Sequence, residues 1–243
     1  MRNVNLSLGT ERVVVVGPNG SGKTTLLRAI LGLAPITSGT ARVFGQDVST
    51  VRGELRVSTN LAEVYRLISL PVRDLLPIFA RLKGGDPAAL ARRVHEFELE
   101  GTLDRKIYEL STGQQKLLGV LLALSAGPGL LLLDEPFDNV DFSRRRRLAA
   151  LLQEQSGAAL LSTHELELLR LFDGWHLAFM FEGRLVGPFE TANVDRLFLS
   201  RGRVPDALAI LETSAGVFSV TLDRGDLPVK NATSLTALVE QLA

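Results

Sequence analysis

The stretch Gly17–Thr25, "GPNGSGKTT", has the pattern G-x-x-x-x-G-K-[ST] of a phosphate-binding loop. It follows Arg12–Val16, "RVVVV", a β-branched run that is typical of a strand buried on both faces. Leu26–Leu31 then predicts a helix, with Gly32 and Pro35 as stop signals. A glycine loop between a strand and a helix is the setting in which this pattern binds phosphate, because backbone N–H groups converge at the helix N-terminus.

Each residue type in this loop has a chemical reason to be there. The glycines let the backbone approach phosphate oxygens, Lys23 brings a cation to the β- and γ-phosphates, and the Thr24 hydroxyl is a ligand for Mg²⁺. The alternative is a glycine-rich turn with an exposed lysine, which the flanking strand and helix disfavour. The predicted nucleotide-binding residues of the loop are Gly17, Pro18, Asn19, Gly20, Ser21, Gly22, Lys23, Thr24 and Thr25.

Composition bounds the class of protein. The 243 residues are 46% apolar, which is enough for one large domain or two small ones with a substantial core. The 27 basic and 27 acidic residues cancel, so no bulk attraction to nucleic acid or anionic membrane is expected. The absence of cysteine excludes disulfides, iron–sulfur ligation and thiol catalysis. Apolar stretches such as Leu117–Leu124 are far short of the roughly 20 residues that span a bilayer. The stretch "MRNVNLSLGTER" has no long apolar core followed by a small-residue cleavage site, so we do not expect a secretory signal. We therefore expect a soluble, cytoplasmic chain.

Two further apolar runs end in polar residues. Leu130–Leu133 leads into Asp134 and Glu135, and Ala158–Ser162 leads into "STHE". Three such strands indicate an α/β fold with a parallel sheet whose ligands gather along one edge. At that edge Asp134 would lie near the metal and Glu135 would polarise a water for in-line attack. Paired carboxylates at a strand end can also form an ordinary solvated turn.

The remaining segments are assigned by their spacing. Residues 71–124 show helical periodicity and predict a helical subdomain, with a helix continuing over Leu117–Ala126 after "LSTGQQ". Gly39–Asp47 predicts a strand leading to a turn, Val217–Leu222 an edge strand, and Ser234–Leu242 a terminal helix.

Taken together the motifs resemble those of the ATP-binding cassette (ABC) ATPases over about Val4 to Gly187. "GPNGSGKTT" is similar to Walker A, "LLLLDEP" to Walker B, "LSTGQ" to the signature, "DNVD" to the D-loop and "STHE" to the His switch. The resemblance implies an α/β P-loop NTPase fold, with a RecA-like core and an ABC-type helical subdomain. The expected single ABC ATPase domain, 1–243, comprises a core of residues 1–60 and 125–200, a helical subdomain of about 61–124, and a small C-terminal addition of about 201–243.

The resemblance explains why the chain has a second glycine-containing loop. In the family two cassettes pair head to tail, and each ATP lies between one chain's phosphate loop and the other chain's signature. It thus implies a homodimer or a paired cassette subunit. The signature residues expected to act in trans are Leu110, Ser111, Thr112, Gly113 and Gln114. From the residues alone, the same stretch is also a simple helix N-cap at Ser111.

Other roles rest mainly on the resemblance. It implies that His164 contacts the γ-phosphate and the attacking water, so that the predicted catalytic residues are Glu135 and His164. It also implies that Asp141 links the two nucleotide sites. His95 is predicted to be a solvated helix residue, and Arg144–Arg147 a solvated helix start with one or two salt bridges.

Three positions depart from the family pattern. Asn60 stands where the Q-loop glutamine is usual, which puts metal contact and coupling to a membrane partner in doubt. Thr112 stands where the signature usually has glycine. No aromatic residue precedes Val16, so adenine stacking has no upstream partner. The predicted cofactors are ATP and Mg²⁺. The predicted ATP-binding residues are Asn60 and Asp134 together with those of the phosphate loop, and the predicted metal ligands are Thr24, Asn60 and Asp134.

The resemblance implies an ATP-binding and ATP-hydrolysing subunit of an ABC transporter, which energises a separate transmembrane permease by ATP-driven dimerisation. It would lie at the inner face of the cell membrane through that partner, with no nucleic acid expected. "STNL" and "DEPFDNVD" faintly resemble subunits for cobalt-type metal uptake. The alternative is a soluble ABC ATPase that acts on a cytosolic complex such as iron–sulfur cluster assembly. Glu135 and His164 disfavour a binding module without turnover.

Overall fold

The computed structural model describes residues 1–50, 53–65 and 69–242. The chain divides into two compact units, which are described separately. Unit 1 comprises Met1–Val51 and Ser162–Ala243, and unit 2 comprises Arg52–Leu161. Unit 2 is therefore inserted in sequence between the two segments of unit 1.

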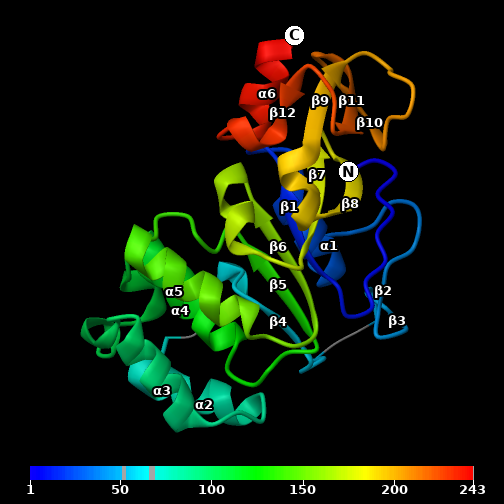
Figure 1. The fold of residues 1–243 in the computed structure, drawn as a ribbon. Coiled ribbons are helices and arrows are strands. Elements are labelled where there is room, and N and C mark those ends of the chain that lie inside the picture. Colours follow the sequence, from blue (N-terminus) through cyan, green and yellow to red (C-terminus); the bar gives the residue numbers. More distant parts are fainter. Residues whose placement is uncertain (51–52, 66–68, 243) are drawn as a thin grey trace. The chain divides into compact units, whose positions relative to one another are not determined.

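Unit 1 combines parallel strands with an antiparallel C-terminal lobe (Figure 1). Strands β1 and β7 pair in parallel, β7 and β8 pair antiparallel, and the lobe is a four-stranded sheet in the order β10-β11-β9-β12. The elements are β1 (Arg12–Val16), α1 (Lys23–Ile30), β2 (Arg42–Val43), β3 (Gln46–Asp47), η4 (Leu166–Leu171), β7 (His176–Phe181), β8 (Arg184–Glu190), η5 (Thr191–Arg196), β9 (Leu197–Arg201), β10 (Ala209–Thr213), β11 (Gly216–Leu222), β12 (Leu227–Pro228), η6 (Val229–Asn231) and α6 (Leu235–Leu242).

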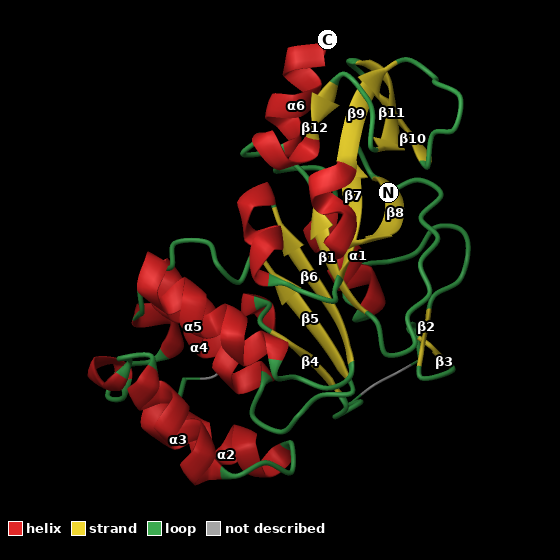
Figure 2. Ribbon diagram, viewed as in Figure 1, coloured by secondary structure: helices red, strands yellow, loops and turns green. Residues whose placement is uncertain are grey.

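Unit 2 contains most of the helices (Figure 2). Strands β4 and β5 pair in parallel, with Val57 opposite Leu130 and Thr59 opposite Leu132. The elements are β4 (Val57–Thr59), η1 (Ala62–Val64), α2 (Val72–Leu82), α3 (Pro87–Glu96), η2 (Glu100–Thr102), η3 (Ile107–Glu109), α4 (Thr112–Ala123), β5 (Leu130–Asp134) and α5 (Phe142–Gln153). Strand β6 (Ala158–Thr163) crosses the boundary between the two units.

The core strands follow directly from their composition. Val13–Val16 of β1 are at most 1% exposed, as expected of a strand whose two faces are both covered. Leu131–Leu133 of β5 are at most 2% exposed. The parallel pairs β1–β7 and β4–β5 confirm the α/β class with parallel strands that the apolar runs predict. The finer division into core, helical subdomain and C-terminal addition stays a prediction.

The C-terminal part of helix α4 is buried on every side. Residues 117–123 are all buried, so this part of the helix has no polar stripe and its sequence lacks a helical hydrophobic period. The helix ends at Ala123, three residues before the predicted end at Ala126, and Leu124 is its C-cap. Helix α1 begins at Lys23 rather than at Leu26, inside the phosphate-loop motif.

The edge-strand prediction for Val217–Leu222 was wrong. Strand β11 lies between β10 and β9, and its residues Phe218–Thr221 are buried rather than alternating in exposure. Gly39–Asp47 forms the short antiparallel pair β2–β3 instead of one strand. The terminal helix is confirmed as α6. Among the helices of the described residues, none has the length and apolar character needed to cross a bilayer.

Candidate functional site

The phosphate loop of unit 1 follows β1 and leads directly into α1. The Gly17 N–H donates to the Thr163 carbonyl at 3.1 Å, which ties the start of the loop to the end of β6. A Cβ at Gly17 would come within 2.0 Å of the Met180 carbonyl oxygen, so only glycine fits there. Gly22, with φ +109, has a backbone conformation that side-chain-bearing residues rarely adopt. The loop is thus formed by glycine at positions where backbone must approach closely.

The Lys23 ammonium is hydrogen-bonded to the backbone of this loop. Its side chain is buried, and Nζ donates to the carbonyl oxygens of Gly17 at 2.6 Å and Pro18 at 3.0 Å. The Ser21 hydroxyl is buried, and within the described part of the chain it has no hydrogen-bond partner. A buried donor of this kind normally has a partner. A cation and an unsatisfied hydroxyl at a helix N-terminus are groups that a phosphate would satisfy.

His164 follows β6 in the same unit. The next residue is fixed by a hydrogen bond from the Glu165 N–H to the Thr163 hydroxyl at 3.2 Å. The Leu166 N–H then donates to the carbonyl of Thr233, in the C-terminal lobe, at 3.1 Å. The segment after the histidine is therefore bonded to a part of the chain that the motifs do not include.

The carboxylates of Walker B lie at the end of β5 in unit 2. Glu135 follows the strand with φ +45, a left-handed backbone conformation that is uncommon for a residue with a side chain. The Asp138 N–H donates to its carbonyl at 3.1 Å, which closes a tight turn. Lys116 of α4 donates through Nζ to the carbonyl oxygens of Asp134 and Glu135, each at 3.2 Å. The strand end is a defined turn rather than an open solvated one.

Asn60 lies next to the same strand end. Its Oδ1 accepts from the Asp134 N–H at 2.7 Å, and its Nδ2 donates to the Asp134 carbonyl at 3.1 Å. The side chain is buried. The prediction that Asn60 is a metal ligand is not tested by these contacts, but both polar atoms of its amide are already bonded to protein.

The signature begins α4. Ser111 is the N-cap, and its hydroxyl accepts from the Gln114 N–H at 3.3 Å, while the Gln114 side chain accepts from the Ser111 N–H at 3.1 Å. This reciprocal pair is a capping box, so the simple N-cap interpretation is correct as a description of local structure. Thr112 is the first helical residue. Ser111 is exposed and Gly113 is half-buried at this helix start, which is compatible with the predicted role in trans.

Asp141 of the D-loop is the N-cap of α5. Its carboxylate accepts from the Arg144 N–H at 3.1 Å and from the Ser143 hydroxyl at 3.0 Å. The hydrogen bond from Arg144 holds the pKa of Asp141 below its usual value of 3.8. Arg144 and Arg147 both pair with Glu98, which confirms a solvated helix start with salt bridges. The role of Asp141 between two nucleotide sites stays a prediction.

The donor set suits Mg²⁺. Thr24 offers a hydroxyl oxygen and Asp134 a carboxylate, which are the hard oxygen ligands that Mg²⁺ prefers. Within the described residues no three or more His, Asp or Glu side chains gather as a metal cage.

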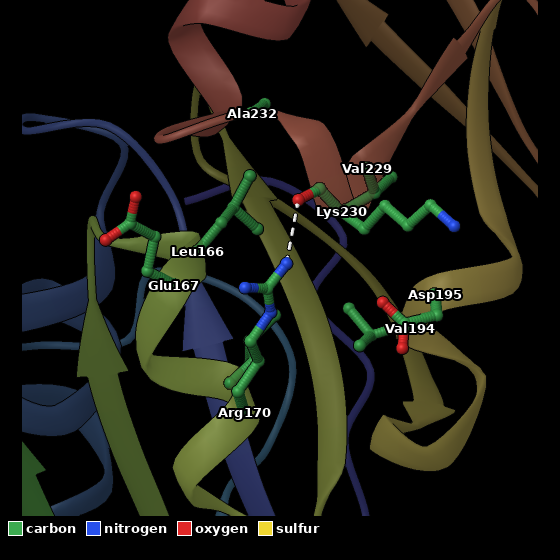
Figure 3. Close-up of a pocket in the computed structure, with 9 residues that line it drawn as sticks. Leu166, Glu167, Arg170, Val194, Asp195, Val229, Lys230 and Ala232 are labelled. Atoms are coloured by element: carbon green, nitrogen blue, oxygen red, sulfur yellow. Dashed lines mark hydrogen bonds between the residues drawn. The ribbon is translucent and has the colours of Figure 1, made fainter.

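A small surface pocket lies beside the segment that follows His164 (Figure 3). Arg170 extends across it and donates through Nη2 to the carbonyl of Lys230 at 3.3 Å. The pocket contains none of the predicted site residues. Its lining is Leu166, Glu167, Leu169, Arg170, Val194, Asp195, Val229, Lys230 and Ala232.

Reasoning from the sequence missed two contacts at the strand end. Neither Lys116 nor the bonding of Asn60 to Asp134 was foreseen, and Asn60 and Asp134 are 74 residues apart. Lys116 follows the signature by two residues, so its position beside that motif is the one local signal that draws attention to it. His95 is exposed and contacts Glu100, which agrees with a solvated helix residue.

The chain has a phosphate loop, a strand that ends in two carboxylates, and a capped helix start that contains a glycine. Together these features define an ATP-binding cassette. The family model described as ABC transporter matches residues 1–138, more than half of the sequence. The chain therefore belongs to the ABC transporter family. The biotin transport ATP-binding protein BioM of Rhizobium etli is 32% identical over 191 residues, covering 75% of this chain and 83% of BioM.

A second relative and a solved structure extend the comparison. The phospholipid-transporting ATPase ABCA3 of Mus musculus is 33% identical over 194 residues, covering 76% of this chain. The chain spans 11% of the length of that protein. A crystal structure named for a cobalt transport ATP-binding protein is 35% identical with a TM-score of 0.89, covering 98% of this chain and 91% of the other. The likeness to that structure includes the C-terminal lobe, and it confirms the predicted fold class.

Proposed function

We propose that this chain hydrolyses ATP with Mg²⁺ and thereby energises a separate membrane permease. The single observation that carries the proposal is the phosphate loop, in which the Lys23 ammonium and the buried Ser21 hydroxyl are placed for a phosphate. Family membership supports ATP as the nucleotide, because relatives are ATP-binding subunits of transporters.

The residues have separate tasks in this proposal. Loop N–H groups and Lys23 bind the β- and γ-phosphates and stabilise the charge that develops on them. Glu135 polarises the attacking water, and His164 hydrogen-bonds the γ-phosphate and that water. Thr24 and Asp134 would hold Mg²⁺, which neutralises charge on the bridged phosphates when bound. Positioning and electrostatics, rather than covalent chemistry, supply the rate enhancement.

The signature completes the proposal as a dimer. Ser111 and Gly113 begin α4, and the N–H groups of a helix start favour an anion. We infer that they contact the γ-phosphate bound by a second cassette, so that ATP binding closes the dimer and hydrolysis reopens it. A permease bound to the closing and opening dimer would then change conformation.

The cobalt-type substrate prediction gains support from the solved neighbour named for cobalt transport. BioM is named for biotin, so the family resemblance by itself does not select one solute. The soluble alternative, an ATPase serving iron–sulfur cluster assembly, is not favoured because the relatives carry transporter names. Copurification with a membrane protein would support the transporter assignment, and copurification with a soluble scaffold would contradict it.

ATP turnover by three variants tests the proposal. Lys23→Ala should lose nucleotide binding or hydrolysis, because the cation aimed at the phosphates is gone. Glu135→Gln should keep ATP binding, slow hydrolysis and accumulate dimer on gel filtration with Mg-ATP. Lys230→Ala, an exposed lysine in the C-terminal lobe, is the charge-matched control and should behave as wild type. Wild-type turnover by Lys23→Ala would refute the phosphate-loop assignment.

A further inference from the structure

The β4–β5 ladder is continued by a side chain where its backbone stops. In the register of the two strands, Thr59 is opposite Leu132. If β4 continued, its next two residues in the ladder would be Asn60 and Leu61. The chain turns away at this point, because the Leu61 N–H donates back to the Thr59 hydroxyl at 3.2 Å. The Asn60 amide instead supplies the missing acceptor and donor to Asp134, at 2.7 and 3.1 Å. We refer to these two hydrogen bonds as the Asn60 clamp.

The clamp is enclosed by α4. A Cβ at Gly119 would lie 3.3 Å from the Asn60 carbonyl oxygen and 3.4 Å from its Cβ, so the helix approaches Asn60 closely because residue 119 has no side chain. Asn60 is 6% exposed. A glutamine would place its amide one methylene farther out, which removes it from the positions that bond the Asp134 N–H and carbonyl at 2.7 and 3.1 Å. The clamp therefore depends on asparagine rather than on any amide.

A second group bonds to the same residue from the helix side. The Asp134 carbonyl accepts both from Asn60 and from the Lys116 ammonium, which also donates to the Glu135 carbonyl. These part-buried hydrogen bonds hold the peptides on both sides of Asp134, because losing one partner leaves a desolvated polar group. The backbone orientation at Asp134 and Glu135 sets the direction in which the two carboxylates leave the strand end.

We infer that Asn60 is a positioning residue for Asp134 and Glu135, and not a ligand of the metal. The expected effect on turnover rests on the proposed function. The existence of the Asn60 clamp does not depend on that function. Removing it lets the Asp134–Glu135 peptide rotate. The water-polarising carboxylate is then misplaced while the phosphate loop and its affinity for ATP are unchanged.

The test compares Asn60→Ala and Asn60→Gln with a control residue that bonds to the same strand. Lys83→Met is the control, since Lys83 donates to the Val57 carbonyl at 2.6 Å, at the other end of β4. Three quantities are measured: kcat and KM for ATP, the Mg²⁺ concentration that half-saturates turnover, and the hydrogen-exchange rate of the Asp134 amide by NMR.

Both Asn60 variants should lower kcat about ten- to a hundredfold, as expected for a misplaced catalytic group. KM for ATP and the half-saturating Mg²⁺ concentration should stay within about twofold of wild type, because binding is not the step affected. Hydrogen exchange of the Asp134 amide should become at least about tenfold faster, because this N–H loses its acceptor, the Asn60 Oδ1. The exchange rate of the Leu131 amide should be unchanged. Lys83→Met should leave kcat and the Asp134 amide as in wild type.

The opposite results would overturn the inference. If Asn60→Gln retains wild-type kcat, or if Asn60→Ala raises the Mg²⁺ requirement about tenfold with Asp134 exchange unchanged, Asn60 acts on the metal. If the wild-type chain hydrolyses no ATP, the proposed function fails. Amide exchange at Asp134 still decides whether the clamp exists, so the two failures are distinguishable.

Discussion

Gly113 lies directly against the backbone of Asn139. A Cβ on Gly113 would come within 2.2 Å of the Asn139 carbonyl oxygen, so the signature glycine packs on the D-loop of the same chain. Asn139 has φ +57, which gives the D-loop a tight turn at the contact. The glycine therefore has a packing requirement within its own unit in addition to its proposed role towards a second nucleotide.

Gly113→Ala should destabilise the fold by about 1–3 kcal/mol, because the added methyl group meets backbone that cannot move aside cheaply. ATP hydrolysis should fall with it, since the start of α4 must shift. Denaturant unfolding and turnover measure the two effects. Gly101→Ala is the matched control, because a Cβ there meets nothing within 4 Å, and its stability should stay near wild type. A stable, fully active Gly113→Ala would contradict the packing argument.

Lys116→Met should lower kcat while leaving ATP affinity nearly unchanged. The substitution keeps the length of the side chain but removes the ammonium that bonds the Asp134 and Glu135 carbonyls. A charged hydrogen bond to a partly buried group is worth about 1.5–3 kcal/mol, so a loss of tenfold or more is expected. Turnover and nucleotide binding by fluorescence separate the two effects. Lys106→Met, at an exposed lysine, should be neutral, and a neutral Lys116→Met would exclude the contact as a determinant of turnover.

Asp141→Ala should lower the melting temperature at pH 7 by about 2–4 °C, because α5 loses its N-cap. The cap is a carboxylate whose pKa lies below 3.8 in the folded chain. The stability that this carboxylate contributes is present above its pKa in the unfolded chain. It is lost as the pH falls through its pKa in the folded chain. The difference between wild type and Asp141→Ala should therefore shrink below about pH 4. Asp206→Ala, which removes an exposed carboxylate outside any helix cap, should show no such difference.

Ser111→Arg should leave ATP binding by the monomer largely intact but prevent hydrolysis. The bulky side chain would fill the place meant for a partner's γ-phosphate. Mixing with Lys23→Ala chains forms dimers in which one site has both damaged loops and the other has both intact loops. Hydrolysis should then partly recover, provided that one intact site suffices. Loss of ATP binding by the Ser111→Arg monomer would instead show that the signature serves its own chain's nucleotide.

Much of the site was visible in the sequence because its chemistry is local. The phosphate loop, the apolar strand before Asp134 and the cap at Ser111 are each written within about ten consecutive residues. The strands, the helix starts and the Ser111 cap are present in the structure, because their geometry depends on neighbours in the chain. The roles of these residues towards ATP stay predictions. The resemblance to the ABC family then accounted for the order of these motifs and for their presence in one chain.

Contacts between distant residues could not be read in the same way. The pairing of Asn60 with Asp134 depends on the β4–β5 register, and no periodicity in either segment encodes it. The interior position of β11 was missed because a strand covered by β10 and β9 looks like an edge strand when its neighbours are not recognised. Residues 117–123 of helix α4 gave no amphipathic pattern because they are all buried, so the end of the helix was placed too late.

The hydrogen bonds of Lys116 bear on the order in which two paired cassettes would hydrolyse ATP. Lys116 lies on the helix that begins with the signature, and it is bonded to the carbonyl of Glu135, the residue proposed to polarise water. If Ser111 contacts a second cassette's phosphate as proposed, a displacement of α4 towards that phosphate would also act on Glu135 through Lys116. The two ATP molecules of the proposed dimer would then be hydrolysed in a correlated order rather than independently.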